Sequence, residues 1–277
     1  MSQATVTADR MEWSDPLAPV LRHRTLTWEL AKREIRDRYA GQVFGAFWAA
    51  GHPIALMAVY VFMFAYVLKL KVGGDTAMPL DFTVYMLAGL VPWLAFQESM
   101  TKAASVVVAN SNLVKQVVFP LEVLPIKGIL AASITQAIAT TLLVLYTLVT
   151  SGSLPWTYVL LPGLWAMQFL AVGGVCYLIA SIAVYFRDVK DFLQLFCTAG
   201  MYFMPICYLP EWVPELVRPV LWLNPFSYLV WCYQDVCYFG RIDHPWAWVV
   251  FAIGSVSVFY VGFNVWRKLK TCFGSVL

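Results

Sequence analysis

The sequence predicts an all-α integral membrane protein with six transmembrane helices, an N-terminal amphipathic interface helix and a re-entrant helical hairpin between the last two spans. The first observation is composition: the 277 residues are 61% hydrophobic and 13% charged, with a mean hydropathy of +0.69. Soluble domains are usually about 25% charged, so this chain has too little polar surface to cover a water-soluble body. The second observation is that the apolar residues form blocks long enough to cross a bilayer.

The N-terminal part divides into two segments. Residues 1–24 are polar, contain Pro16 and Pro19 and show no periodicity, which predicts a mobile cytoplasmic arm. Residues 25–46 predict an amphipathic helix, because apolar side chains recur at helical spacing: Trp28, Ala31, Ile35 and Tyr39. The other face carries Glu29, Lys32, Arg33, Arg36 and Asp37. Such a helix either lies on anionic lipid or docks a cytoplasmic partner, and the pattern leaves both readings open.

A six-helix membrane domain is expected over residues 47–270, because roughly 20 apolar residues cross a ~30 Å hydrocarbon core. Five blocks reach that length: Phe47–Leu68, Thr83–Ala109, Leu124–Val149, Trp156–Phe186 and Trp246–Trp266. Phe192–Leu209 is a marginal further span, and the shorter apolar stretch Val220–Tyr233 follows it. Residues 271–277 are expected to form a short cytoplasmic tail.

Charge predicts that both termini are cytoplasmic. The first 46 residues are basic and lack an apolar run of about 7–15 residues with a cleavage site, so no signal peptide is expected. With six crossings, segments 1–46, 102–127, 187–191 and 267–277 lie inside. Of the 19 Lys and Arg residues, the outside segments keep only Lys69, Lys71, Arg218 and Arg241, as the positive-inside rule expects. The net charge of +3 therefore reflects topology, and no nucleic-acid partner is expected.

Two inside connections stand out. The loop of residues 110–122 is apolar for a cytoplasmic connector, which predicts one short helix across the membrane face, stopped by Pro120. This helix either rests on the bilayer or fills a groove in another protein. Arg187–Asp191 predicts a tight charged turn, and a topological role is enough to explain its charges.

Proline marks the last third as irregular. Five of the 15 prolines fall close together: Pro205, Pro210, Pro214, Pro219 and Pro225. Proline breaks the helical ladder, and backbone groups freed at membrane depth must be buried in protein or face water. Residues 205–240 are therefore expected to form short, half-depth helices in a re-entrant hairpin on the outer side, closed by Glu211, Glu215 and Arg218. The alternative is a plain outer loop.

The sequence contains no catalytic set. It lacks a Gly-x-x-x-x-Gly-Lys-Ser/Thr loop, His-Glu-x-x-His and Gly-x-Ser-x-Gly, so neither nucleotide binding, a metal site nor an enzymatic activity is expected. Inside the spans, Glu98 and Lys102 share one helical face, where mutual neutralisation is favoured over an ion relay. The six cysteines resemble buried hydrophobes, with a disulfide among Cys207, Cys232 and Cys237 as the alternative.

Aromatic side chains are abundant in the first, second and fifth spans. Helix packing explains most of them, although aromatic faces also stack on the C–H faces of sugar rings, which suits a sliding polymer. The candidates for such a path are Trp48, Tyr60, Tyr66, Tyr85, Trp93, Phe96, Tyr202 and Phe203. Composition alone does not decide between core and path.

Several stretches, in matching order over about residues 25–270, resemble the polysaccharide-export permeases of the ABC-2 class. Arg33-Glu-Ile-Arg-Asp-Arg-Tyr39 and Gly45-Ala-Phe-Trp-Ala-Ala-Gly-His-Pro53 are similar to the family's RDxxxRY and LGxxWAxxxP. The further matches are Leu87-Ala-Gly-Leu-Val-Pro-Trp93, Asn110–Pro125 with LVKxVxFPxExLP, Phe186-Arg-Asp188 and Asn224-Pro-Phe226. Phe44 departs from the expected Leu, and His52 from the usual Gln or Glu.

The resemblance implies a permease subunit that forms a homodimer and recruits two copies of a separate ATPase, which would bind ATP and Mg. This chain would hold no cofactor. The interface helix, the 110–122 loop and the 187–191 turn become candidate ATPase contacts: Arg33, Arg36, Arg38, Tyr39, Asn112, Lys115, Phe119, Pro120, Glu122, Arg187 and Asp188. The proline-rich hairpin is similar to outer helices that close the channel toward the periplasm.

The expected function is export of undecaprenyl-linked polysaccharide across the bacterial inner membrane. Lipopolysaccharide O-antigen is favoured as cargo, because Tyr39–Pro53 and Asn110–Pro125 are most similar to those permeases. The alternatives are a capsule polysaccharide or teichoic acid permease, a drug or small-lipid exporter, and a membrane-embedded glycan-modifying enzyme.

Overall fold

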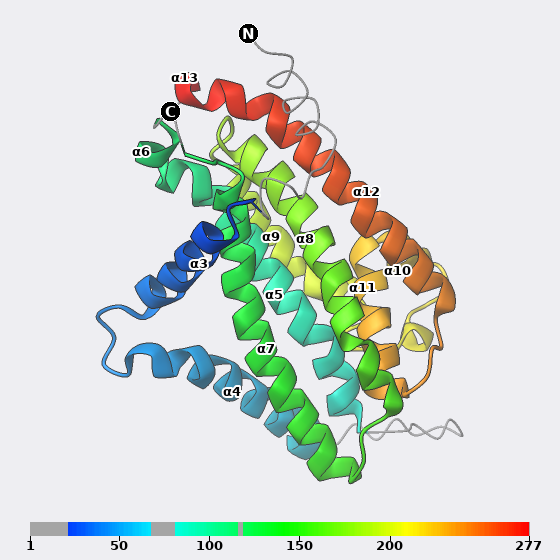
Figure 1. Cartoon of the computed structure of the whole chain (residues 1–277). Coiled ribbons are helices and arrows are strands. Elements are labelled where there is room, and N and C mark those ends of the chain that lie inside the picture. Colours follow the sequence, from blue (N-terminus) through cyan, green and yellow to red (C-terminus); the bar gives the residue numbers. More distant parts are fainter. Residues whose placement is uncertain (1–21, 68–80, 116–118, 277) are drawn as a thin grey trace.

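The computed structural model describes residues 22–67, 81–115 and 119–276, and the regular elements within those ranges are all helical (Figure 1). The predicted arm up to residue 21, Lys69, Lys71 and residues 116–118 of the predicted loop helix lie outside the described residues. The all-α class is therefore confirmed for the described part of the chain.

Four long helices build the bundle: α5 (Phe82–Ala109), α7 (Val123–Ser151), α8 (Leu161–Ala183) and α12 (Pro245–Leu269). In the described ranges, three continuous helical stretches are long and apolar enough to cross a membrane, namely Val123–Ser151, Trp156–Ala183 and Pro245–Cys272. They agree closely with three of the predicted apolar blocks and confirm a multi-pass membrane protein.

Shorter helices surround these four. They are α3 (Arg24–Tyr39), α4 (Trp48–Val61), α6 (Ser111–Val114), α9 (Val189–Gly200), α10 (Arg218–Leu223), α11 (Pro225–Gln234) and α13 (Phe273–Val276). Single 3-10 or π turns join them: η1 (Gly45–Phe47), η2 (Phe62–Val67), η3 (Trp156–Leu160), η4 (Met201–Phe203), η5 (Pro210–Trp212), η6 (Asp235–Phe239) and η7 (Lys270–Cys272).

The predicted span Phe192–Leu209 is helical only in its first part. After η4, Met204 is extended, with φ −125° and ψ 151°. The pyrrolidine ring of Pro205 excludes the helical region for the residue before it, which explains the break. The predicted loop helix is also shorter, since α6 covers only Ser111–Val114.

The interface helix ends earlier than expected. α3 stops at Tyr39 instead of continuing to residue 46, and the chain then turns through Gly41 (φ 79°) and Gly45 (φ 49°). Both values lie in the left-handed region that glycine adopts without steric cost. These glycines therefore separate α3 from α4, so that the interface helix does not run directly into the first span.

The predicted apolar face of α3 agrees only in part with the face that packs on the bundle. Thr27 and Ala31 are buried, and α3 packs against α7. Trp28 is 44% exposed, and the ammonium group of Lys32 lies 5.6 Å from its ring centroid. The inner face of the helix therefore carries the small side chains of Thr27 and Ala31, followed by Glu34 and Arg38.

Glycine lets α8 and α12 approach closely. A Cβ atom on Gly262 of α12 would lie 2.1 Å from the carbonyl oxygen of Gly174 on α8. A Cβ atom on Gly174 would lie 2.4 Å from the carbonyl oxygen of Val258. Small residues allow such backbone contact between membrane helices, which associate through van der Waals packing.

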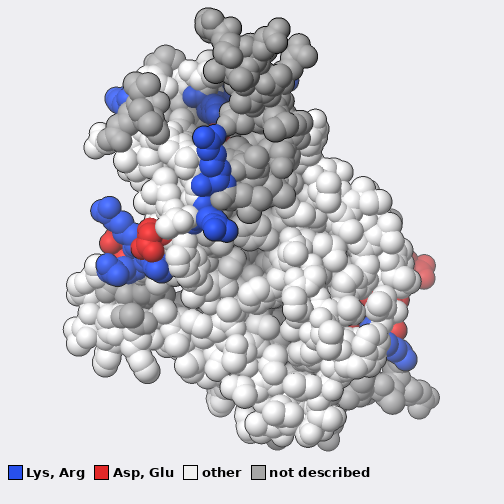
Figure 2. All heavy atoms as spheres, in the orientation of Figure 1, with Lys and Arg blue, Asp and Glu red and all other residues white. Residues whose placement is uncertain are grey.

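The helix termini form two distinct ends of the molecule. At one end, Glu34 of α3 pairs with Lys102, late in α5, and Lys127, early in α7. Figure 2 shows Lys and Arg gathered toward the end that carries α3 and α6, next to a wide uncharged face. At the other end, the hydroxyl of Tyr146 donates a 2.9 Å hydrogen bond to Asp81. The described segments that were predicted to lie inside thus meet at one end.

The proline-rich region folds back into the bundle. The Gln234 side chain donates a 2.7 Å hydrogen bond to the carbonyl oxygen of Pro205, so the two limbs of this region lie side by side. α11 packs against α5 and α12, and its residues from Leu229 to Gln234 are buried. Cys207, Cys232 and Cys237 form no disulfide with one another.

Candidate functional site

Charged side chains join the interface helix to the bundle. The carboxylate of Glu34 lies 3.3 Å from Lys102 Nζ and 3.3 Å from Lys127 Nζ. Lys102 Nζ also lies 3.5 Å from Glu98, which confirms the predicted pairing of these two residues. Arg38 of α3 donates a hydrogen bond to the same carboxylate oxygen of Glu98, Oε1. We call these five residues the α3 charge cluster, and it ties α3 to both α5 and α7.

Glu34 is ionised at neutral pH in this setting. Burial raises the pKa of its carboxyl group, but the nearby ammonium groups of Lys102 and Lys127 lower it further than burial raises it. The net pKa lies below the ordinary value of 4.5. The cluster combines three basic residues with two acidic ones.

The predicted contact residues of α3 separate into two faces. Arg33 and Arg36 are exposed, and Arg33 lies 3.4 Å from Asp37 on the outer face. Arg38 is turned inward to Glu98 and is 25% exposed. The side chain of Tyr39 lies outside the described residues. Only Arg33 and Arg36 therefore present an outward surface among the described side chains of this set.

The predicted contact residues in the loops fall into an exposed group and a more buried group. Asn112, Lys115, Arg187 and Asp188 are exposed, whereas Phe119 and Pro120 are half-buried. Glu122 is only 7% exposed, and its carboxylate accepts a hydrogen bond from Lys270 near the C-terminus. The backbone carbonyl of Glu122 accepts a 3.0 Å bond from Tyr177. The geometry of Glu122 favours a role within the chain.

The predicted path residues lie in three different settings. Tyr85, Trp93 and Phe96 are buried in α5, where Trp93 and Phe96 pack against the Phe226 ring and Tyr85 against Tyr238. Tyr66, Tyr202 and Phe203 are exposed, at 67%, 64% and 56%. Trp48 and Tyr60 line a cavity. The structure therefore does not bring all eight to one surface of the chain.

This cavity has a volume of about 690 Å³ and lies between α4, α5 and α7, with Arg38 at the end of α3 also in its lining. Arg38, Glu98 and Lys102 of the α3 charge cluster line one part of it. The remaining wall includes aliphatic side chains such as Leu56 and Leu90, together with polar ones such as Thr135 and Gln136. The cavity therefore combines a charged part with an apolar part.

The structure contains a polar network in the middle of the bundle that the sequence did not lead us to predict. Gln136 of α7 donates a 2.8 Å hydrogen bond to the side-chain oxygen of Gln168 of α8, which also accepts from Tyr233 of α11. Gln168 in turn donates to the carbonyl oxygen of Pro92 in α5, at 3.3 Å. These buried bonds link four helices at a depth where an unpaired polar group is costly.

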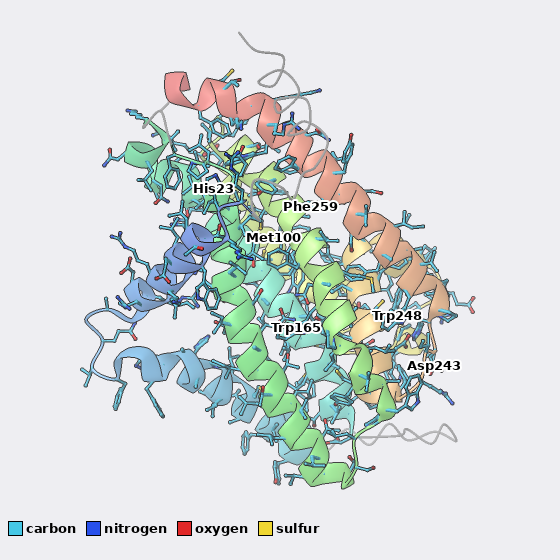
Figure 3. The ribbon with its side chains drawn as sticks, in the orientation of Figure 1. His23, Met100, Trp165, Asp243, Trp248 and Phe259 are labelled. Carbon is cyan, nitrogen blue, oxygen red and sulfur yellow. The ribbon has the colours of Figure 1, made fainter. Side chains whose placement is uncertain are left out.

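Asp235 is a second feature that was not predicted, since only Glu98 and Lys102 were expected as ionisable groups within the membrane. Its side chain is fully buried in η6. It accepts from the backbone N–H of His244 at 3.1 Å and from Trp248 Nε1 at 3.0 Å, and His244 Nδ1 lies 2.8 Å from its other oxygen. In Figure 3, Trp248 lies at the start of α12, at the end of the bundle away from His23. Through these contacts with His244 and Trp248, Asp235 links η6 to the start of α12.

Asp235→Ala should lower the free energy of unfolding by about 3 kcal/mol, because it leaves buried donors of His244 and Trp248 without an acceptor. Thermal unfolding in detergent measures the change. Asp243→Ala is the matched control: Asp243 pairs with Arg241, whose side chain is 75% exposed, and such pairs contribute about 0–1 kcal/mol. Equal effects of the two changes would contradict the role given to Asp235.

The sequence profile of the ABC-2 type transporter membrane region matches residues 25–238 of this chain. With these helices and this match over most of its length, the chain belongs to the ABC-2 type transporter family. The family expected from the sequence motifs is confirmed.

Alignments with similar proteins cover 85–90% of this chain. An O-antigen export system permease protein RfbA of Myxococcus xanthus is 30% identical over 85% of this chain and 88% of its own length. An RfbA permease of Klebsiella pneumoniae is 23% identical over 90% of this chain and 93% of its own. The polysialic acid transport protein KpsM of Escherichia coli is 20% identical over 85% of this chain and 90% of its own.

Proposed function

We propose that this chain is the transmembrane permease subunit of an ATP-driven exporter that moves undecaprenyl-linked polysaccharide, with lipopolysaccharide O-antigen as the cargo. The observation that carries the proposal is its similarity, over 85% or more of the chain, to permeases named for O-antigen export. The helical membrane architecture is consistent with it. The missing nucleotide-binding motif fits a subunit whose ATPase is a separate protein.

The similarity to KpsM supports a second candidate, a capsule polysaccharide such as polysialic acid. The lower identity of 20%, against 30% for the Myxococcus xanthus O-antigen permease, favours O-antigen. Deleting the gene in its own host distinguishes the two candidate cargoes. O-antigen export predicts loss of surface O-antigen with lipid-linked glycan retained at the inner membrane. Loss of capsule with intact surface O-antigen would reject the first candidate.

The proposed topology has six crossings in the inner membrane, with both termini in the cytoplasm. α4, α5, α7, α8, α9 and α12 would be the spans. α10, α11 and η6 would form the re-entrant hairpin on the periplasmic side. Its support is that α3 and the ends carrying Lys102, Lys127 and Lys270 meet at one end of the bundle. Basic segments favour the cytoplasmic side.

In the proposed assembly, two copies of this chain bind two copies of an ATPase. The outward residues Arg33 and Arg36 of α3, together with Lys115 and Arg187, would contact the ATPase. ATP-driven closure of the ATPases would move α3, and the α3 charge cluster would pass that movement to α5 and α7. The two permease copies would then shift apart along a path that includes the exposed aromatics Tyr202 and Phe203.

Reversing both Arg33 and Arg36 to Glu should remove the ATPase from the purified complex and reduce surface glycan at least about tenfold, because both guanidinium groups are exposed on the outer face of α3. Co-purification and surface-glycan staining measure this. Arg241→Glu is the control, since Arg241 is 75% exposed near the other end of the bundle. Normal export and a normal complex in the double variant would reject the docking role of α3.

A further inference from the structure

We propose that the cavity between α4, α5 and α7 binds an anionic phospholipid from the membrane leaflet that faces α3. The headgroup phosphate would lie against Arg38, and one acyl chain would extend along the aliphatic wall of the cavity. This site goes beyond polysaccharide export and does not depend on which cargo the permease carries.

The separation of α4 from the bundle creates the space. Among the residues of α4, only Pro53 and Met57 are buried, and the cavity of about 690 Å³ lies between this helix and its neighbours. Pockets of about 300–1,000 Å³ accommodate drug-sized ligands, so an acyl chain fits. An empty apolar space would leave its walls without contacts, whereas a hydrocarbon chain provides them.

The polar and apolar parts of the cavity match the two parts of a phospholipid. Leu56, Leu87, Leu90 and Leu94 supply aliphatic wall from α4 and α5. Arg38 and the other charged residues lie where α3 meets the cavity. A ligand with a charged head and an apolar tail would satisfy both parts in one orientation, with its headgroup toward the cytoplasmic end.

The charge of the cavity favours an anion. Arg38, Lys102 and Glu98 line the cavity, so its lining has one more basic residue than acidic residues. An anionic headgroup would neutralise this excess, and Arg38 offers the fork of donors that suits a phosphate. Basic pockets between transmembrane helices on the cytoplasmic side bind anionic lipid headgroups by this principle.

The proposal changes the expectation for two path residues. Trp48 and Tyr60 line the same cavity, so both would contact the bound lipid. Amphipathic aromatic rings are common at the level of the headgroups, and Trp48 is the first residue of α4.

Native mass spectrometry of the full permease–ATPase complex in detergent, titrated with phosphatidylglycerol or phosphatidylcholine, tests the site. We expect phosphatidylglycerol to bind about tenfold more tightly, and Arg38→Gln to abolish this preference, because one charge-assisted contact is worth about that factor. Leu56→Trp, which fills the cavity without changing its charge, should reduce retention of phosphatidylglycerol at least about tenfold.

Leu145→Trp is the matched control, since Leu145 is 52% exposed on α7 and does not line the cavity. It should retain the lipid as the unaltered complex does. Equal binding of both phospholipids, or full retention in Leu56→Trp, would overturn the proposal. Preferential displacement of phosphatidylglycerol by an equal concentration of polyprenyl phosphate would also overturn it, by showing that the site takes the carrier lipid. None of these results bears on the gene-deletion test of export.

Discussion

Gly262→Ala should destabilise the folded permease by roughly 3 kcal/mol or more, measured as a lower midpoint of thermal unfolding in detergent. Overpacking typically costs about 1–3 kcal/mol when side chains can adjust. At this position the new methyl group would lie 2.1 Å from the backbone carbonyl oxygen of Gly174, which cannot rotate away as a side chain does. α8 and α12 would therefore have to separate along their contact.

Gly254→Ala is the control on the same helix. A Cβ atom on Gly254 would meet nothing within 4 Å, so the substitution should leave the midpoint unchanged or raise it slightly. Gly174→Ala should resemble Gly262→Ala, because its Cβ atom would lie 2.4 Å from the backbone of Val258. A Gly262→Ala protein as stable as the Gly254→Ala protein would show that the two helices are not packed through these glycines.

Glu34→Lys should reduce glycan export at least about tenfold while the ATPase still co-purifies with the permease. The change places a further ammonium group beside Lys102 and Lys127, each 3.3 Å from the present carboxylate. The repulsion would detach α3 from α5 and α7, but the outer face with Arg33 and Arg36 would remain available. Surface glycan, ATP hydrolysis and co-purification are measured in parallel.

The exchange variant Glu34→Lys with Lys127→Glu keeps the total charge of the cluster and should recover a large part of export. Recovery separates a pairing effect from a general effect of charge. Loss of export in both the single and the exchange variant, with loss of the complex, would instead indicate that Glu34 supports folding alone.

The contribution of Glu34 to the free energy of unfolding should depend on pH in one direction. Because the pKa of Glu34 is lowered in the folded chain, its contribution to stability is fully present above the ordinary value of 4.5. It is lost as the pH falls through the lower folded-state value. Glu34→Gln should therefore lower the unfolding midpoint at neutral pH, and the difference from the unaltered protein should shrink in acid.

The long helices could be predicted because the length of an apolar block is a local property of the sequence. α7 and α12 agree closely with the blocks Leu124–Val149 and Trp246–Trp266. The helical part of the predicted span Phe192–Leu209 already ends at Phe203, which follows from Pro205, a residue recognised as part of an irregular region.

Contacts between helices could not be predicted in the same way. The pairing of Glu98 with Lys102 follows from their spacing on one helix, whereas Glu34 meets Lys102 and Lys127 across three different helices. The close contact of Gly174 with Gly262 could not be predicted for the same reason, because no local sequence pattern indicates which helix a glycine will face.

Asp235 was missed because its segment was read as part of an outer hairpin. The available signal was a single acidic residue within an apolar and aromatic run from Leu229 to Phe239. Such a residue needs buried donors, and His244 and Trp248 lie a short distance further along the chain. Composition could not predict whether Tyr85, Trp93 and Phe96 lie in the core or along the path, because aromatic rings are common in both.

The contact between Glu122 and Lys270 sets an order for biosynthesis. The two residues are 148 positions apart, and Lys270 follows the last long helix. A ribosome adds about 5–20 residues per second, so Glu122 is present for many seconds before its partner is made. A carboxylate without a partner is costly to bury. The end of the bundle that carries α3 and α6 should therefore close last, and a nascent chain truncated before residue 270 should leave Glu122 accessible to water.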